Sequence, residues 1–284
     1  MPTLNLKVNG ISHWVKIAGQ GPPILALHGG PGGNHFVFEH TTGPMLEKFR
    51  KLIYLESRGC GRSQRPTNGD WSIPALLSDL DEVLTQLELP EVTLFGNSFG
   101  GGLATTYALT RPQRVKTLIL QAPWWFGMDV ASHQISGFLP LLPPALRTEV
   151  QSLLLHQPAR DTLEFIWSQI EGDVADRFLF EDLQVAALNR QLWEESGLVN
   201  TGEMHDFLLQ HPPDPIHHRL GELSCPTLVL LGKHDRNIPV AQTLTLASSI
   251  PNCKGVVFEN SAHFPDLEEA LRFVQAIKDF LLPT

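Results

Sequence analysis

Residues 92–100 read Val-Thr-Leu-Phe-Gly-Asn-Ser-Phe-Gly, and this stretch decides the fold. Its apolar start is typical of a buried strand, and the small residues that begin near Gly100, with a helical pattern at 103–110, indicate a helix beyond it. A Gly-x-Ser-x-Gly motif between a strand and a helix exposes its serine hydroxyl above a parallel sheet. We therefore predict that Ser98 is a nucleophile on this turn. The alternative is a glycine-rich turn that only packs well.

Further apolar runs of strand length lie on both sides of this stretch. They alternate with helical patterns, which implies crossover connections and a mainly parallel sheet. Residues 4–8 and 13–17 alternate in polarity, as an opening antiparallel pair does. We expect an α/β fold with antiparallel strands at one edge. The predicted strands are residues 24–27, 52–55, 92–95, 115–120, 227–231 and 256–258, and the predicted helices are 73–87, 103–110, 240–249 and 267–282.

The alternation stops once, between Ala122 and Cys225. This stretch of about a hundred residues is rich in Trp and Pro and is too long for a simple crossover. Helical patterns at 161–170 and 176–193 indicate an inserted, mostly helical cap over the carboxyl edge of the sheet. The expected organisation is a core formed by residues 1–122 and 221–284, with a cap of residues 123–220.

The partners of Ser98 are expected where later strands end. A serine hydroxyl is a weak nucleophile until a base takes its proton. With this motif, the chain order is nucleophile, acid, base. Asp235 follows the predicted strand 227–231, and His263 follows the strand that ends at 258. We predict that Asp235 orients the imidazole of His263, which takes the proton of Ser98.

Two neighbours of these residues compete for the same roles. His234 adjoins Asp235 but precedes it in the chain, which the expected order disfavours. Asp266 is a second acid, and we expect it to cap the final helix instead. A solvated loop histidine is the other interpretation of His263, and the chain order and strand-end position both speak against it.

An oxyanion hole needs backbone N–H groups aimed at the negative charge that develops on the substrate. One is expected from Phe99, the residue after the nucleophile. The other is expected from Gly30, in a loop that reads His-Gly-Gly-Pro-Gly-Gly at residues 28–33. A dinucleotide site is the alternative for this loop. It is disfavoured because no Gly-x-Gly-x-x-Gly opens a clean helix here.

Three motifs of the core resemble those of the proline iminopeptidase group of α/β-hydrolases. They are His-Gly-Gly-Pro-Gly at 28–32, Arg-Gly-Cys-Gly-Arg-Ser at 58–63 and Gly-Asn-Ser-Phe-Gly-Gly at 96–101. The resemblance covers the core but hardly the cap. It implies an α/β-hydrolase fold and release of an N-terminal residue, usually proline, from peptides. The chain departs from the group at Glu56-Ser57, where Asp-Gln is usual, and at Phe99, where Trp is usual. These departures bear on the specificity for proline.

The resemblance also implies that acidic side chains of the cap hold the free amine of the substrate. Glu194, in a Trp-Glu-Glu element, is the first candidate, and Glu195 and Glu203 come next. The alternative for an acidic residue on a cap helix is a solvated face.

Aromatic residues gather at the start of the predicted cap, where Trp124, Trp125 and Phe126 are consecutive. With Phe138 and Trp167 they are candidates for a pocket that takes an apolar ring. The alternative is that they form the cap's own core, the commoner use of such side chains.

Composition and charge restrict the partners. The net charge of −9 argues against nucleic acid and against an anionic membrane surface. No apolar run is long enough for a bilayer, and the N-terminus does not resemble a secretory signal. Three separated cysteines suit a reducing compartment. We expect a cytoplasmic enzyme that acts on a small molecule or short peptide. The sequence leaves its oligomeric state open.

The sequence therefore predicts a serine hydrolase that works through an acyl-enzyme, without metal or organic cofactor, because the triad supplies both nucleophile and proton transfer. The first hypothesis is an aminopeptidase that acts on small peptides or amides. The second is an esterase, lactonase or amidase with the same triad and a different cap pocket. A catalytically silent binding protein is the third, and the complete set of catalytic elements disfavours it.

Overall fold

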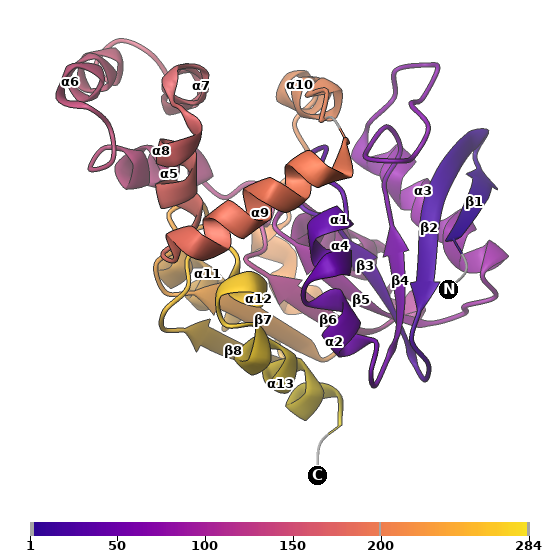
Figure 1. The fold of residues 1–284 in the computed structure, drawn as a ribbon. Coiled ribbons are helices and arrows are strands. Elements are labelled where there is room, and N and C mark those ends of the chain that lie inside the picture. The colour runs from indigo at the N-terminus through magenta and orange to yellow at the C-terminus, as the bar shows by residue number, and fades with distance from the viewer. Residues whose placement is uncertain (1–2, 199, 283–284) are drawn as a thin grey trace.

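An eight-stranded sheet forms the centre of the computed structural model, which describes residues 3–198 and 200–282 (Figure 1). The strand order is β1-β2-β4-β3-β5-β6-β7-β8. β2 pairs antiparallel with β1 and with β4, and the other neighbours are parallel. The strands are β1 (Thr3–Val8), β2 (Ile11–Ala18), β3 (Pro23–Leu27), β4 (Lys51–Leu55), β5 (Val92–Asn97), β6 (Val115–Gln121), β7 (Thr227–Gly232) and β8 (Cys253–Phe258). The predicted α/β architecture with antiparallel strands at one edge is confirmed.

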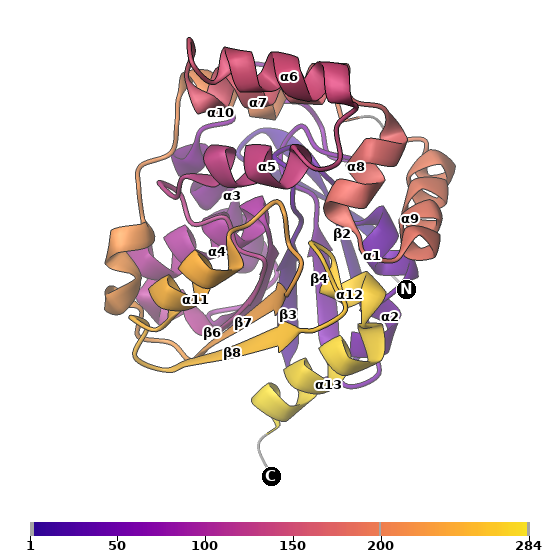
Figure 2. The same ribbon diagram turned by 90° about the vertical axis from the view of Figure 1, so that its left-hand side faces the viewer.

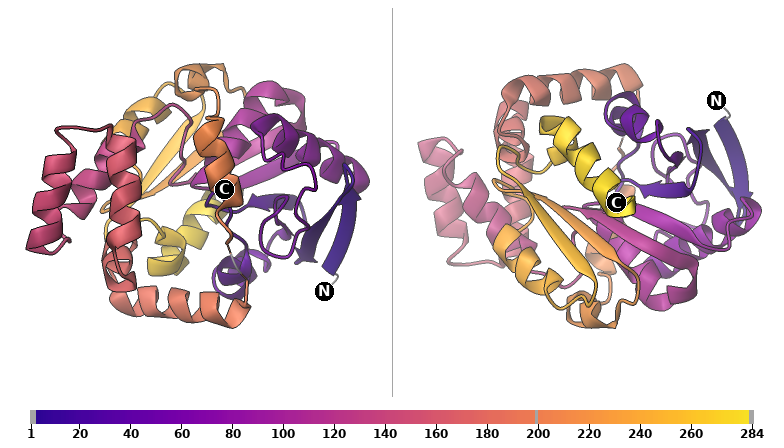
Figure 3. Two further views of the ribbon diagram at one scale, coloured as in Figure 1. Left: turned by 90° about the horizontal axis from the view of Figure 1, so that it is seen from above. Right: turned by 90° about the horizontal axis from the view of Figure 1, so that it is seen from below.

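Side chains of the central strands alternate between two hydrophobic cores. Leu25 and Leu94 belong to the larger core, which includes side chains of α3 (Ile73–Gln86) and α4 (Phe99–Thr110). Ile24 and Phe95 belong to the core on the opposite face, with side chains of α13 (Ala270–Leu281). Figure 3 shows α13 on one side of the sheet and α3 and α4 on the other. Because both faces are buried, these strands read as continuous apolar runs rather than alternating ones.

Helices in the segments between and after the strands complete the core. α3 begins where the Ser72 side chain accepts a hydrogen bond from the N–H of Ala75, a standard N-cap. The other core helices are α1 (Phe36–His40), α2 (Gly43–Leu46), α11 (Val240–Ala247) and α12 (Pro265–Glu268).

Between β6 and β7 the chain forms helices that lie above the strands and around their upper ends in the view of Figure 2. They have a small core of their own, in which the rings of Phe138 and Phe178 stack with centroids 3.7 Å apart. The predicted boundary at residue 220 falls inside a 3₁₀ helix, His217–Glu222. We propose that these helices form the cap. They are α5 (Val130–Phe138), α6 (Pro144–Leu153), α7 (Ala159–Gln169), α8 (Gly172–Leu179), α9 (Leu183–Ser196) and α10 (Glu203–Gln210).

Two predicted helices are each divided in the structure. The prediction of one helix over 267–282 is wrong, because the chain leaves helical geometry at Glu269, whose carboxylate accepts hydrogen bonds from Asn260 and Ser261. The prediction of one helix over 176–193 is wrong as well. The Asp182 side chain caps α9 there, while Glu268 accepts hydrogen bonds from the N–H groups of Glu181 and Asp182.

Candidate active site

Ser98 lies at the turn between β5 and α4 with φ 51° and ψ −113°, a conformation that a non-glycine residue rarely adopts. Close packing around the turn holds it there. A Cβ on Gly96 would lie 2.4 Å from the carbonyl oxygen of Gly100, and one on Gly100 would lie 2.4 Å from that of Leu27. The Ser98 N–H also donates to the Gln121 carbonyl at 2.9 Å. Strain of this kind persists where the surroundings enforce it, typically at functional sites.

His263 and Asp235 form a buried hydrogen-bonded pair. The Nδ1 of His263 lies 2.9 Å from Oδ2 of Asp235, and both side chains are almost fully buried. The other carboxylate oxygen of Asp235 accepts hydrogen bonds from the N–H groups of Asn237 at 2.7 Å and Ile238 at 2.9 Å. Because Asp235 can only accept at this position, Nδ1 carries the proton and donates it. The Nε2 of His263 is then the basic nitrogen.

Ser98 and His263 line the same cavity, which has a volume of about 320 Å³. The cavity is bounded by the ends of core strands and by cap helices α7, α8 and α9. The competing candidate His234 is not among its lining residues, and its Nε2 lies 3.1 Å from the Glu259 carbonyl. The lining residues are Gly29, Gly30, Gly33, Asn34, Val37, Phe38, Asn97, Ser98, Trp167, Leu179, Asn189, Trp193, Asn200, Asn237, His263, Phe264, Asp266 and Leu267.

Of the two candidate oxyanion donors, Gly30 lines the same cavity as Ser98 and Phe99 follows Ser98 in the chain. Gly30 lines the cavity with φ +129°, and a Cβ there would lie 2.5 Å from the Gly32 nitrogen, so only glycine fits. Phe99 is the first residue of α4, which makes its N–H one of those without a partner inside the helix. α4 begins at Phe99, next to the expected start near Gly100, and this places the helix N-terminus directly behind Ser98.

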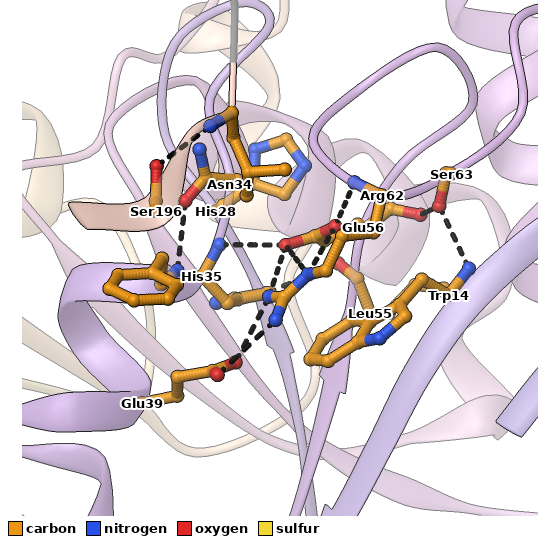
Figure 4. Close-up of polar contacts among 12 residues, drawn as sticks. Trp14, His28, Asn34, His35, Glu39, Leu55, Glu56, Arg62, Ser63 and Ser196 are labelled. Carbon is orange, nitrogen blue, oxygen red and sulfur yellow. Dashed lines mark hydrogen bonds and ion pairs between the residues drawn. The ribbon is translucent and has the colours of Figure 1, made fainter. Parts of the chain in front are cut away.

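A buried ionic network holds the loop that carries Gly30 (Figure 4). Glu56, which is fully buried, accepts hydrogen bonds from the Arg62 guanidinium and from the N–H of His35 at 3.3 Å. Arg62 also pairs with Glu39 at 3.0 Å and stacks 3.3 Å from the centre of the Trp14 ring. The network therefore ties residues 28–35 to the segment after β4.

The imidazole of His35 fastens the same loop to the sheet. Its Nε2 lies 3.0 Å from the Ala26 carbonyl and 3.1 Å from the Leu55 carbonyl, at the ends of β3 and β4. Burial holds the pKa of His35 well below its usual range, so the ring is neutral and Nε2–H donates. The sequence motif at 58–63 indicated a family resemblance, whereas this supporting role of Glu56 and His35 was missed. The sequence did hold a signal for this role: Glu56 lies between the glycine-rich segments 28–33 and 59–61, and Arg62 follows it by six residues.

We expect replacement of Glu56 by Gln to lower the free energy of unfolding by about 2–4 kcal/mol, because Arg62 would lose its fully buried partner. Turnover should fall too, since the loop of Gly30 would lose an anchor. Urea denaturation and steady-state kinetics on one preparation measure both effects. Glu222→Gln is the matched control, because its pairing with Arg219 is exposed and its loss should leave both measurements unchanged. Equal stability of the wild type and Glu56→Gln would contradict the prediction.

Asp266 lies inside the cavity rather than at a helix cap. The prediction that it caps the final helix is wrong, because Phe264 precedes α12 and Glu269 precedes α13 at the N-cap positions. Asp266 is among the residues that line the cavity, and its buried carboxylate accepts a hydrogen bond at Oδ1 from Nε2 of Gln121 at 2.5 Å. Burial raises the pKa of Asp266 to about 6.

The predicted acids of the cap do not line the cavity. Glu194 and Glu195 are exposed on α9, and Glu203 pairs with Arg65 at 3.3 Å. α9 contributes Asn189 and Trp193 to the cavity wall, which are four residues apart and share one face of the helix. Each further residue turns about 100° around the axis, so positions 194 and 195 point away from that face.

Trp124 and Trp125 are also absent from the described cavity lining. Trp125 is fully buried, and its Nε1–H donates to Oγ1 of Thr105 in α4 at 3.1 Å. The Trp124 ring packs against Phe99 with centroids 6.3 Å apart. Both tryptophans therefore pack around α4 behind the nucleophile. The aromatic part of the cavity wall comes from Phe38, Trp167, Trp193 and Phe264.

The residues that the structure describes include no group of three or more His, Cys, Asp or Glu side chains placed to hold a metal ion. Within the same residues, no helix has the length and apolarity needed to cross a membrane.

The chain belongs to the α/β-hydrolase fold family, whose model matches residues 22–270. It is 28% identical over 261 residues to the 2-hydroxy-6-oxononadienedioate/2-hydroxy-6-oxononatrienedioate hydrolase 1 of Pseudomonas putida, covering 91% of this chain and 87% of that one. It is 28% identical over 275 residues to a proline iminopeptidase of Heyndrickxia coagulans, covering 93% and 91%.

Among solved structures, a proline iminopeptidase-related protein from Thermus thermophilus superposes with a TM-score of 0.80 at 24% identity, covering 99% of this chain and 96% of that one. This likeness confirms the fold. The Heyndrickxia coagulans relative supports the resemblance to proline iminopeptidases that the core motifs indicated.

Proposed function

We propose that this protein is a serine hydrolase in which Ser98, His263 and Asp235 form the catalytic triad. The observation that supports it best is the 2.9 Å hydrogen bond between His263 and Asp235 beside a cavity that Ser98 also lines. The strained backbone of Ser98 and the orientation of Asp235 by two N–H groups agree with these roles.

In the proposed mechanism, Oγ of Ser98 attacks the substrate carbonyl while Nε2 of His263 takes the hydroxyl proton. The N–H groups of Gly30 and Phe99 stabilise the negative charge on the carbonyl oxygen. His263 then passes its proton to the leaving group, whose bond to the carbonyl carbon breaks. A water that His263 deprotonates attacks the acyl-enzyme, and release of the acid returns the proton to Ser98.

Charge in the cavity restricts the substrate. Among the described lining residues Asp266 is the one carboxyl group, and there is no Lys or Arg. The name of the Pseudomonas putida relative denotes a dicarboxylate, and a second carboxylate placed in this cavity would be repelled without a cation to hold it. We therefore propose substrates that are uncharged or carry an amine, and not dicarboxylates.

Within that class we propose an aminopeptidase that releases an N-terminal residue from small peptides or amides. The carboxylate of Asp266 and the proline iminopeptidase relative support this choice. The second candidate is an esterase, lactonase or amidase. It is favoured by the exposure of Glu194 and Glu195 outside the cavity, where they cannot hold a substrate amine beside Ser98.

Arylamides of proline and alanine, each with a free or an acetylated amine, decide between these candidates. We expect kcat/KM to be at least about tenfold higher for the free amines, the size of one charge-assisted contact. This preference should be present above pH 6 and lost below it, because Asp266 is ionised only above its pKa of about 6. At each pH the quantity compared is the ratio of kcat/KM for the free amine to kcat/KM for the acetylated substrate. The titration of groups that both substrates need, such as the catalytic base, cancels in this ratio.

Asp266→Asn should remove the preference for free amines and leave the acetylated substrates unaffected. The Gln121 side-chain amide can rotate by 180° so that its Oε1 accepts a hydrogen bond from the amide of the new side chain. This Oε1 is buried without a partner among the described residues. Glu194→Gln is the matched control and should behave as the wild type. Equal rates on free and acetylated amides in the wild type would rule out the aminopeptidase and leave the esterase or amidase.

A further inference from the structure

A second, apolar cavity adjoins the one that holds Ser98. Its volume is about 210 Å³, and its walls come from α1, α2, α9, α12 and α13. None of its described lining residues is ionisable. It is lined by Val37, Thr41, Thr42, Met45, Val185, Leu188, Asn189, Leu192, Leu267 and Ala270, and we call it the apolar recess.

The recess and the active-site cavity share three lining residues, Val37, Asn189 and Leu267. The two cavities are therefore neighbours, separated by no more than these shared side chains, and the recess lies beside the site where a substrate carbonyl would meet Ser98. At the far side Leu188 is 46% exposed, so the recess opens towards solvent along α9. Nothing in the proposed triad or oxyanion hole uses these residues.

We propose that the recess binds the apolar group of the substrate, a linear or aromatic group of roughly six to eight carbons. The size follows from volume: an apolar cavity of about 150 Å³ takes up benzene, and a methylene is about as large as a water molecule at about 30 Å³. The chemistry of the bound group follows from the wall, because most of the lining side chains are apolar and a charged group would lose its hydration there without gaining an ionic partner. This inference rests on the proposed function, since it concerns the same carbonyl substrate.

Two series of esters test the inference and identify which half of the substrate enters the recess. One series joins acyl groups from acetyl to decanoyl to p-nitrophenol, and the other joins acetate to linear alcohols of the same lengths. Once the chain enters the recess, each added methylene should raise kcat/KM about fourfold, the value of one buried methylene. The rise should stop after roughly six to eight carbons, when the recess is full.

Variants on one helix separate filling of the recess from other effects. Val185→Phe places a ring in the recess and should lower kcat/KM for the longest chains at least about tenfold while sparing the acetyl substrate. Ala187→Phe makes a similar change at an exposed position of α9 outside the lining and should leave the profile unchanged. Met45→Ala enlarges the recess and should move the optimum to longer chains.

A flat profile in both series overturns the inference, and so does a Val185→Phe variant that slows every substrate equally. Failure of the proposed function looks different. In that case the acetyl ester would be hydrolysed as fast by Ser98→Ala as by the wild type, whatever the chain-length profile.

Discussion

Replacing Ser98 with Ala should lower kcat by about 10⁴–10⁶-fold, because the remaining groups offer no nucleophile to form an acyl-enzyme. The residual rate would come from the oxyanion donors and from substrate binding. The fold should be retained, since the Ser98 hydroxyl makes no hydrogen bond to another described residue and the backbone at this turn is held by its N–H and by neighbouring glycines. Active-site titration with an organophosphonate and a burst assay on an activated ester measure the loss directly.

Ser136→Ala is a suitable control, because it removes a serine hydroxyl from the exposed side of α5 and should leave kcat unchanged. The wild type should also become labelled by the phosphonate at Ser98, which peptide mass mapping would locate. Full hydrolytic activity in a pure Ser98→Ala preparation would overturn the assignment of the nucleophile.

Asp235→Asn should be the next most damaging change, with a loss of about 10³–10⁴-fold in kcat. An amide at position 235 can donate to Nδ1 of His263, which would move the ring proton to Nε2, the nitrogen that must accept the proton of Ser98. The volume and the two N–H contacts of the side chain are nearly preserved, so the loss should be in turnover rather than in folding.

Steady-state kinetics on an uncharged ester, with a thermal melt of each variant, distinguishes those two outcomes. Asp129→Asn is the matched control, because this exposed carboxylate caps α5 and asparagine is an equally good cap. A kcat for Asp235→Asn within a few-fold of the wild type would argue that another acid orients His263.

Local pattern predicted the core of the fold well. β5 and the turn at Ser98 could be recognised because a buried parallel strand and its glycine-flanked serine are contiguous in the chain. The helical pattern itself could be recognised only from residue 103, because the glycines at 100–102 are poor helix formers. Packing explains them: a Cβ on Gly101 would lie 2.9 Å from Pro123, and one on Gly102 would lie 2.2 Å from the Trp124 carbonyl.

The candidate site could be predicted only where chain order determines position. Asp235 and His263 each follow a strand, so parallel pairing brings them to one edge of the sheet. No comparable rule of chain order predicts which residues of the cap line the cavity. Asn189 and Trp193 line the cavity, whereas Glu194 does not, and the difference is a rotation about α9 that tertiary packing sets. Asp266 was misjudged for the same reason, since its partner Gln121 lies 145 residues away in the chain.

α9 contributes lining residues to both the active-site cavity and the apolar recess. Trp193 lines the cavity of Ser98, Val185, Leu188 and Leu192 line the apolar recess, and Asn189 lines both. The proposed nucleophile, its proposed base and the candidate oxyanion donors all lie outside α9. Substitutions along this single helix would therefore reshape the walls around a substrate while leaving the proposed bond-breaking groups in place.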